Sequence, residues 1–393
     1  MVVNRPPNTI ERMGSIVVVG MFDSVHFARW VAQFQATNLE ISLFPSGPHR
    51  RVHPILTGIL EDQSKPLTIH FPRLLSALAI PLWIVDRFIG DRLRGFLLAK
   101  RIKNANVDYV HALELQHAGY ITAAAYKFLD TFGRKTRPKL IVTNWGSDIF
   151  WYSKIPNHKL KLVKLLARAD SYSAECKRDY ELAQNLGYRG DFLPIIPNAG
   201  GLPHSWLVQT KMPCSLRKVI SIKGYETWSG QALLALDSIR SLEDKLQGYE
   251  IVVFSASRKT KQNVRKIATS TSISISAFGK NKLTHDQVLN LLSRSRIYLG
   301  VSRTDGISTS MLEAMSAGAF PIQSSSSCAS EWFEDKKTGF SLRSNTIDEI
   351  RQALLFALEK DKLVDKAQTI NQSTLVERYE SEKIASIART FYR

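Results

Sequence analysis

Short apolar runs alternate with longer segments of mixed apolar and polar residues along the first half of the chain. Each apolar run predicts a buried strand, and the runs lie at 15–20, 41–44, 107–111, 140–143, 169–174 and 191–195. Helical patterns separate them, one of the clearest over 119–130. Strands that alternate with helices in this way predict a doubly wound parallel sheet.

The second half repeats this plan. Its strands are predicted at 218–222, 250–254, 272–278, 297–301 and 320–323, with helices between them. A stretch rich in proline and glycine, 194–213, is the expected join. The predicted domains are therefore 1–205 and 206–375. A charged helix follows over 376–393, at the end of the amphipathic segment Thr374 to Arg393, and packing back on the first domain is one option for it.

Composition narrows the class of protein. The chain has 393 residues, of which 44% are hydrophobic and 22% charged, as in globular proteins. Its three cysteines are far apart, which fits a reducing compartment and argues against a structural zinc site. Residues Met1 to Gly14 lack the apolar core of a signal peptide. We therefore expect a cytoplasmic protein.

The net charge of +18 is spread over both halves of the chain. Such charge is compatible with nucleic-acid binding, but no zinc finger, RNP-type aromatic motif or basic zipper is present, and we expect no nucleic-acid partner. An anionic membrane surface explains the charge at least as well. A simple contribution to solubility is the remaining alternative.

One segment, 74–103, favours the membrane. It mixes long apolar residues with arginine and lysine, and Pro81 and Gly90 interrupt it, so it is a poor membrane-spanning helix. A basic amphipathic helix can lie among lipid headgroups, which predicts a peripheral protein on the inner face of the cell membrane. The equally weighted alternative is a pair of helices packed on the sheet of the first domain.

The most informative stretch runs from Ser302 to Pro321. An apolar strand precedes it, and a loop of small residues then leads into a helix from about Thr309 that ends near Gly318. A strand, a small-residue loop and a helix N-terminus together form an anion site. The carboxylates of Asp305 and Glu313 flank the loop, and they indicate a ligand with hydroxyl groups, such as a ribose or hexose. A phosphate and a sugar in one pocket suggest a sugar-nucleotide enzyme. An ordinary helix with two solvated acids is the alternative.

This stretch resembles the E-x7-E signature of glycosyltransferase family 4. Asp305 stands at the first acidic position, the spacing to Glu313 is kept, and the tail Glu313 to Pro321 is nearly complete. Further elements of the chain are similar to the family, including Ser24 to Trp30 and the Gly-Ser-Asp-Ile loop at 146–149. The resemblance implies a GT-B fold, with two doubly wound Rossmann-like domains facing each other across a cleft. It also implies a retaining transferase that needs no metal.

The resemblance assigns donor contacts in the second domain. Lys223 would bind the donor diphosphate, although the Arg/Lys pair that is usual there is incomplete, and Arg258 is a candidate for the second cation. Glu313 would accept hydrogen bonds from the ribose, and Asp305 would face the transferred sugar. The remaining donor contacts would come from Phe278 and Gly279 near the base, and from Gly306, Ile307, Ser308 and Thr309 near the phosphate or sugar.

The first domain would supply the acceptor side. Family members carry a histidine in the loop after the strand at 107–110, and here His111 and His117 are both candidates. We favour His117 as the catalytic histidine. His26 and Asp148 are further candidates, either for the acceptor or for bracing a loop.

These features predict a retaining glycosyltransferase with a UDP-, GDP- or ADP-sugar as donor and no separate cofactor. Its acceptor would be a glycan or a lipid-linked glycan, as in surface polysaccharide assembly of the O-antigen or capsule type. The altered Lys223 loop and Asp305 also allow a non-catalytic subunit of the same fold that binds a sugar nucleotide or glycan. An epimerase or phosphorylase of this fold is a weaker alternative.

Overall fold

The computed structural model describes residues 14–47, 51–62, 64–132 and 137–393. The chain forms two compact units. The first contains the described residues up to Gly200 together with 385–393, and the second contains 201–384. The division after Gly200 lies within the proline- and glycine-rich stretch, close to the boundary at 205/206 that the sequence suggested.

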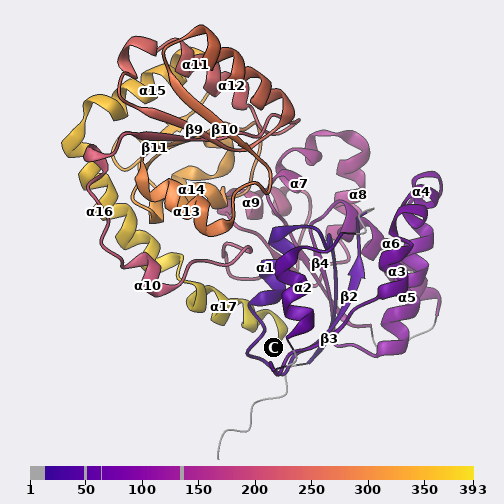
Figure 1. Ribbon diagram of the computed structural model, residues 1–393. Helices are drawn as coiled ribbons and strands as arrows, with labels where there is room; N and C mark the ends of the chain where they lie inside the picture. The colour runs from indigo at the N-terminus through magenta and orange to yellow at the C-terminus, as the bar shows by residue number, and fades with distance from the viewer. Residues whose placement is uncertain (1–13, 48–50, 63, 133–136) are drawn as a thin grey trace, which may run out of the picture. The chain divides into compact units, whose positions relative to one another are not determined.

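The first unit is built on a parallel sheet of seven strands in the order β3-β2-β1-β4-β5-β6-β7 (Figure 1). Every pair of neighbouring strands is parallel, as expected for a doubly wound sheet. The short edge strand β3 was not predicted. The strands are β1 (Ser15–Gly20), β2 (Glu40–Pro45), β3 (Thr68–His70), β4 (Tyr109–Leu113), β5 (Lys139–Thr143), β6 (Ser171–Ser173) and β7 (Asp191–Phe192).

Helices pack on this sheet because their apolar sides fill its core with aliphatic and tyrosine side chains. Figure 1 shows α5 and α6 side by side in this unit. The helices are α1 (Val25–Ala32), α2 (Pro54–Glu61), α3 (Arg73–Ala77), α4 (Ala79–Ile89), α5 (Arg92–Ala105), α6 (His117–Thr131), α7 (Ser147–Phe150), α8 (Pro156–Leu166) and α9 (Lys177–Asn185).

The basic apolar segment 74–103 forms α3, α4 and α5. Pro81 does not interrupt it, because it lies in the first turn of α4, where the missing N–H has no partner within the helix. Gly90 does end α4, with a φ of 70° that favours glycine. Among the described residues, every helix is too short or too polar to cross a bilayer.

The second unit has a parallel six-stranded sheet in the order β10-β9-β8-β11-β12-β13. The strands are β8 (Val219–Lys223), β9 (Glu250–Ala256), β10 (Ser274–Gly279), β11 (Ser295–Gly300), β12 (Phe320–Ser324) and β13 (Phe340–Leu342). The helices are α10 (His204–Leu207), α11 (Ala232–Arg240), α12 (Arg258–Ser270), α13 (His285–Arg294), α14 (Thr309–Ser316), α15 (Ile347–Glu359) and α16 (Asp361–Arg378). Two Rossmann-like units with parallel sheets confirm the predicted fold class.

The end of the chain is not the single helix predicted from Thr374 to Arg393. The long helix α16 ends at Arg378, and α17 (Ser381–Arg389) begins after a break at Tyr379 and Glu380. Residues 385–393 belong to the first unit, where the Tyr392 hydroxyl accepts a hydrogen bond from Trp30 Nε1 at 3.2 Å.

Candidate functional site

The strand order of the second unit places a candidate site at the carboxyl ends of β8 and β11. Strand β8 pairs with β9 on one side and with β11 on the other, so the chain changes direction across the sheet between β8 and β11. Ligands of open α/β sheets bind at such a switch point. Lys223 is the last residue of β8, and Asp305 lies in the loop between β11 and α14.

Lys223 is the cation at the centre of this site. It is half-buried, and its Nζ atom lies 5.2 Å from the ring centroid of Tyr225. Burial alone would lower the pKa of Lys223, but Tyr298 and the carboxylates of Asp305 and Glu313 raise it overall. The structure thus brings together Lys223 and the two acidic residues that the sequence singled out. A positive charge held at this position favours an anionic ligand.

The backbone after Lys223 requires a glycine. A Cβ atom on Gly224 would lie 2.7 Å from the Cα atom of Ala256, at the end of β9. Further along, the loop is joined to the segment after β11, because Gly230 pairs with Ser302 and the Arg303 N–H donates to the Ser229 carbonyl at 2.7 Å. These contacts fix the position of Lys223 relative to the acidic loop.

Helix α14 begins at the acidic loop and offers backbone N–H groups to a ligand. Ser308 is its N-cap residue, and its side chain forms none of the usual capping bonds in the described structure; its hydroxyl lies 3.4 Å from the Tyr298 hydroxyl. The N-terminus therefore retains donors for an anion. Gly306 differs from the expectation, because its N–H already donates to Asp305 Oδ1 at 3.0 Å. Ile307 and Ser308 are buried, and Thr309 is half-buried.

Glu313 is oriented by a histidine that the sequence did not reveal. Only 5% of Glu313 is exposed, and its Oε1 atom lies 2.8 Å from Nε2 of His285. His285 is the first residue of α13, where the capping box of Thr284 and Gln287 fixes the start of the helix. That box is visible in the sequence, but the contact with α14 depends on tertiary packing.

The remaining donor candidates lie at the ends of β9 and β10. Arg258 is exposed at the first position of α12, and Phe278 is 39% exposed in β10. Lys261, also in α12, is half-buried, and its Nζ atom lies 3.5 Å from the position of a Cβ atom on Gly279. Lys261 is therefore a second cation at this edge of the sheet, beside the predicted base contact.

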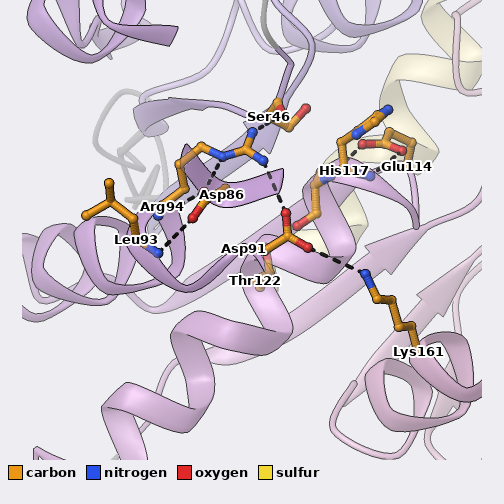
Figure 2. A network of polar contacts seen from close by, with 10 residues as sticks. Ser46, Asp86, Asp91, Leu93, Arg94, Glu114, His117, Thr122 and Lys161 are labelled. Carbon is orange, nitrogen blue, oxygen red and sulfur yellow. Dashed lines mark hydrogen bonds and ion pairs between the residues drawn. The ribbon is translucent and has the colours of Figure 1, made fainter. Parts of the chain in front are cut away.

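In the first unit, His117 is exposed at the start of α6. The Glu114 carboxylate caps this helix by accepting hydrogen bonds from the backbone N–H groups of Gln116 and His117, both at 3.0 Å, and from that of Ala118. Figure 2 shows Glu114 beside His117. Glu114 adopts a φ of 91°, a conformation that costs energy for a side chain with a Cβ atom. Burial raises the pKa of Glu114, although His117 and the backbone donors favour its charged form.

His111 has a structural position, contrary to the acceptor role that the sequence suggested. It is fully buried in β4, and its two ring nitrogens lie 2.7 Å from the Tyr392 hydroxyl and 2.6 Å from Thr143 Oγ1. Both polar atoms of the ring are therefore occupied by protein. His111 therefore connects β4 to the end of the chain.

Asp148 braces two loops, which is one of the two roles that the sequence left open. Its carboxylate accepts hydrogen bonds from Leu115 N at 3.0 Å and Trp145 N at 2.8 Å, and so joins the loops after β4 and β5. Burial raises the pKa of Asp148 well above its usual range. His26 is half-buried in α1, with its ring centroid 5.5 Å from that of Trp145.

Acid is expected to destabilise the protein through His111. Burial lowers the pKa of His111 from 6.5 to about 3, so the unfolded chain binds its proton more readily than the folded chain. The free energy of unfolding should therefore fall by about 1.4 kcal/mol for each pH unit below the unfolded pKa, until the folded pKa is reached. Urea unfolding of the wild type and of His111→Gln across this range measures the effect. Glutamine can still bond Tyr392 and Thr143 but does not titrate, so equal pH slopes for the two proteins would contradict the prediction.

Comparison with known families supports the reading of the second unit. Residues 214–374 match the family described as glycosyl transferases group 1. This match covers the sheet of the second unit and its candidate site. No curated protein sequence matches the chain.

Solved structures of glycosyltransferases share the fold of the whole chain. HepE of Anabaena in complex with UDP-glucose has a TM-score of 0.66 at 14% identity, over 96% of this chain and 99% of HepE. A glycosyltransferase from Rickettsia africae gives the same score and identity, over 96% and 97%. A UDP-forming α,α-trehalose-phosphate synthase from Burkholderia xenovorans has a TM-score of 0.68 at 12% identity, over 96% and 97%. The fold is thus that of the GT-B glycosyltransferases.

Proposed function

We propose that the protein is a glycosyltransferase that moves a sugar from a nucleoside-diphosphate sugar to an acceptor hydroxyl. The observation that carries this proposal is the position of Lys223 close to Asp305 and Glu313, at the switch point of the second sheet and beside the N-terminus of α14. This combination offers a cation and backbone donors for a diphosphate, and carboxylates for sugar hydroxyls. The group 1 match over the same unit supports the same class of reaction.

The proposed roles follow from this arrangement. Lys223 offsets the charge that develops on the diphosphate leaving group as the glycosidic bond breaks. Glu313, held by His285, accepts hydrogen bonds from the ribose hydroxyls, while Asp305 faces the transferred sugar. The donors at the start of α14 bind the phosphate or the sugar. Arg258 or Lys261 supplies a second cation, and Phe278 and Gly279 lie near the base.

The finer features of the reaction also belong to the proposal. Resemblance to glycosyltransferase family 4 supports retention of the anomeric configuration and side-chain cations in place of a metal ion. The donor is a UDP-, GDP- or ADP-sugar, and HepE, whose structure holds UDP-glucose, makes UDP-glucose the first probe. His117 is the proposed catalytic histidine of the first unit, because it is exposed at a helix start beyond β4.

The acceptor in this proposal is a glycan or a lipid-linked glycan of surface polysaccharide assembly, of the O-antigen or capsule type. The basic and apolar segment 74–103 supports the lipid-linked form, and it also supports a peripheral location on the inner face of the cell membrane.

A non-catalytic subunit that binds a sugar nucleotide is the second candidate function. Two departures from the family pattern favour it: Asp305 replaces the usual glutamate, and Lys223 is the sole cation in its loop as far as Gly230. Binding of a sugar nucleotide without release of nucleoside diphosphate, with acceptor present, would support this alternative.

Thermal unfolding with a panel of UDP-, GDP- and ADP-sugars tests the proposal. The matching donor should stabilise the wild type by about 2.7 kcal/mol at a hundredfold excess over its dissociation constant. A shift with one nucleotide, followed by release of nucleoside diphosphate on addition of acceptor, is the expected result. If every sugar nucleotide leaves the melting temperature unchanged, the proposal fails.

A further inference from the structure

Exposed apolar side chains are concentrated on α3, α4 and α5. Eight of the twenty large apolar side chains that are exposed in the described chain lie between residues 74 and 96. Leu74 is 72% exposed and Phe88 is 83% exposed. The others are Leu78, Ile80, Ile84, Val85, Ile89 and Phe96. We call the surface formed by these eight residues the α3–α5 face.

Helix α4 exposes its apolar side, whereas a helix that packs on a core buries that side. A surface helix usually buries its apolar stripe and exposes its charges. The buried residues of α4 are Ala79 and Asp86, whereas Ile80, Ile84 and Phe88, spaced four residues apart on one side of the helix, are exposed. Packing within the protein therefore does not account for the apolar stripe, which is available to a partner.

Polar contacts hold α4 in this orientation. Figure 2 shows Asp86 accepting from Arg94 Nε at 2.6 Å and from the Leu93 N–H at 2.8 Å, at the start of α5. Arg94 also bonds the Ser46 carbonyl at 2.7 Å, just beyond β2, and Asp91 at 3.1 Å. A buried ion pair thus joins α4, α5 and the end of a sheet strand, and the apolar residues of α4 are left outside.

The ion pairs of Arg94 also neutralise the two acidic residues near the α3–α5 face. Asp86 and Asp91 are the acidic residues between 71 and 105, and Arg94 pairs with both. The cations of this segment that remain exposed are Arg73, Arg87, Arg92, Lys100 and Lys103. The surface presented by the three helices is therefore apolar and cationic. An anionic bilayer is complementary to both properties, because it accepts apolar side chains at the acyl boundary and cations at the headgroups.

We infer that the α3–α5 face docks on an anionic lipid bilayer, with Ile84 and Phe88 at the acyl boundary and Arg87 and Arg92 among the headgroups. A second copy of the chain is a poor occupant, because a two-fold contact would bring the same cations together. This inference deepens the proposed membrane location. It does not depend on sugar transfer, since lipid binding is measured without donor or acceptor.

A fluorescent label at position 88 tests the inference directly. The three natural cysteines, Cys176, Cys214 and Cys328, are buried, so Phe88→Cys offers an accessible thiol for an environment-sensitive probe. Leu216→Cys is the matched control, because Leu216 is 64% exposed in the second unit. Vesicles of phosphatidylcholine with phosphatidylglycerol should shift the emission of the probe at 88 to the blue and leave the probe at 216 unchanged. Vesicles of phosphatidylcholine alone should shift neither.

Neutralising variants measure the electrostatic part of the binding. Vesicle sedimentation of Arg87→Gln/Arg92→Gln should show affinity for the anionic vesicles reduced by about 30-fold, and binding of the wild type should weaken as salt is added. The control, Lys259→Gln/Lys266→Gln, removes two exposed cations from α12 of the second unit and should bind as the wild type does. Phe88→Ser should also weaken binding.

Three outcomes would overturn the inference. These are an unshifted probe at 88, equal binding of the neutralising and control variants, and a change of oligomeric state in Phe88→Ser without a change in lipid binding. The last would assign the face to a protein contact. Thermal stabilisation by sugar nucleotides in the same preparations separates a failure of this inference from a failure of the proposed function.

Discussion

Turnover is expected to fall by about 10²–10³-fold when Lys223 is replaced with alanine. Lys223 is the cation at the end of β8, and it lies near the carboxylates of Asp305 and Glu313. Removing it leaves negative charge at the place where the diphosphate would leave, so both the ground state and the departing group lose a favourable interaction. Initial rates of nucleoside-diphosphate release, measured with the donor found in the thermal panel, give the size of the effect.

A matched control separates this effect from a general loss of positive charge. Lys259 is exposed in α12 of the same unit, and Lys259→Ala should keep the rate of the wild type. The melting temperature of Lys223→Ala without donor shows whether the variant is folded. A folded Lys223→Ala protein with full turnover would contradict the role of Lys223 in the reaction.

Replacing Glu313 with alanine is expected to weaken donor binding by about 10- to 150-fold. This range corresponds to a loss of about 1.5–3 kcal/mol, the cost of removing hydrogen bonds to a charged group. The carboxylate is almost fully buried, and His285 contacts its Oε1 atom, so the substitution removes an oriented acceptor for a ribose hydroxyl. Calorimetric titration with the nucleoside diphosphate measures the loss without involving the transferred sugar.

A nucleotide lacking a ribose hydroxyl makes the test specific. If Glu313 accepts from that hydroxyl, the deoxy analogue should bind the wild type more weakly, but the analogue and the parent nucleotide should bind Glu313→Ala equally well. His285→Gln tests the orienting contact. It should cost about 1.5 kcal/mol of donor binding, the lower end of the range for a hydrogen bond to a charged group. Additive losses for Glu313→Ala and the deoxy analogue would show that the two groups do not interact.

The central parallel strands of both units could be predicted because they are buried on both faces. The apolar runs at 15–20 and 297–301, for example, correspond to β1 and β11 within one or two residues. The short edge strands β3 and β13 were missed, although the equally short β6 and β7 were predicted. The break between α16 and α17 was missed because the amphipathic pattern continues across Tyr379 and Glu380.

The histidines show that local sequence also does not predict the tertiary partners of single side chains. The sequence offered both His111 and His117 as candidates and favoured His117, and the structure buries His111 against Tyr392 and exposes His117. Tyr392 comes from the far end of the chain, and local spacing carries no information about such a partner. His285 was overlooked for the same reason, because its contact is with a residue on another helix.

The sequence alone determined the two-sheet architecture and the acidic loop, because strand burial, helix starts and the spacing from Asp305 to Glu313 are local properties of the chain. The tertiary structure decided which side chains surround each site residue. Packing of β8 beside β11 brings Lys223 close to the acids, α13 places His285 against Glu313, and the pair of Asp86 and Arg94 turns the apolar side of α4 outward. These contacts join residues distant in sequence, so they are set by the topology of the sheets and not by any local pattern.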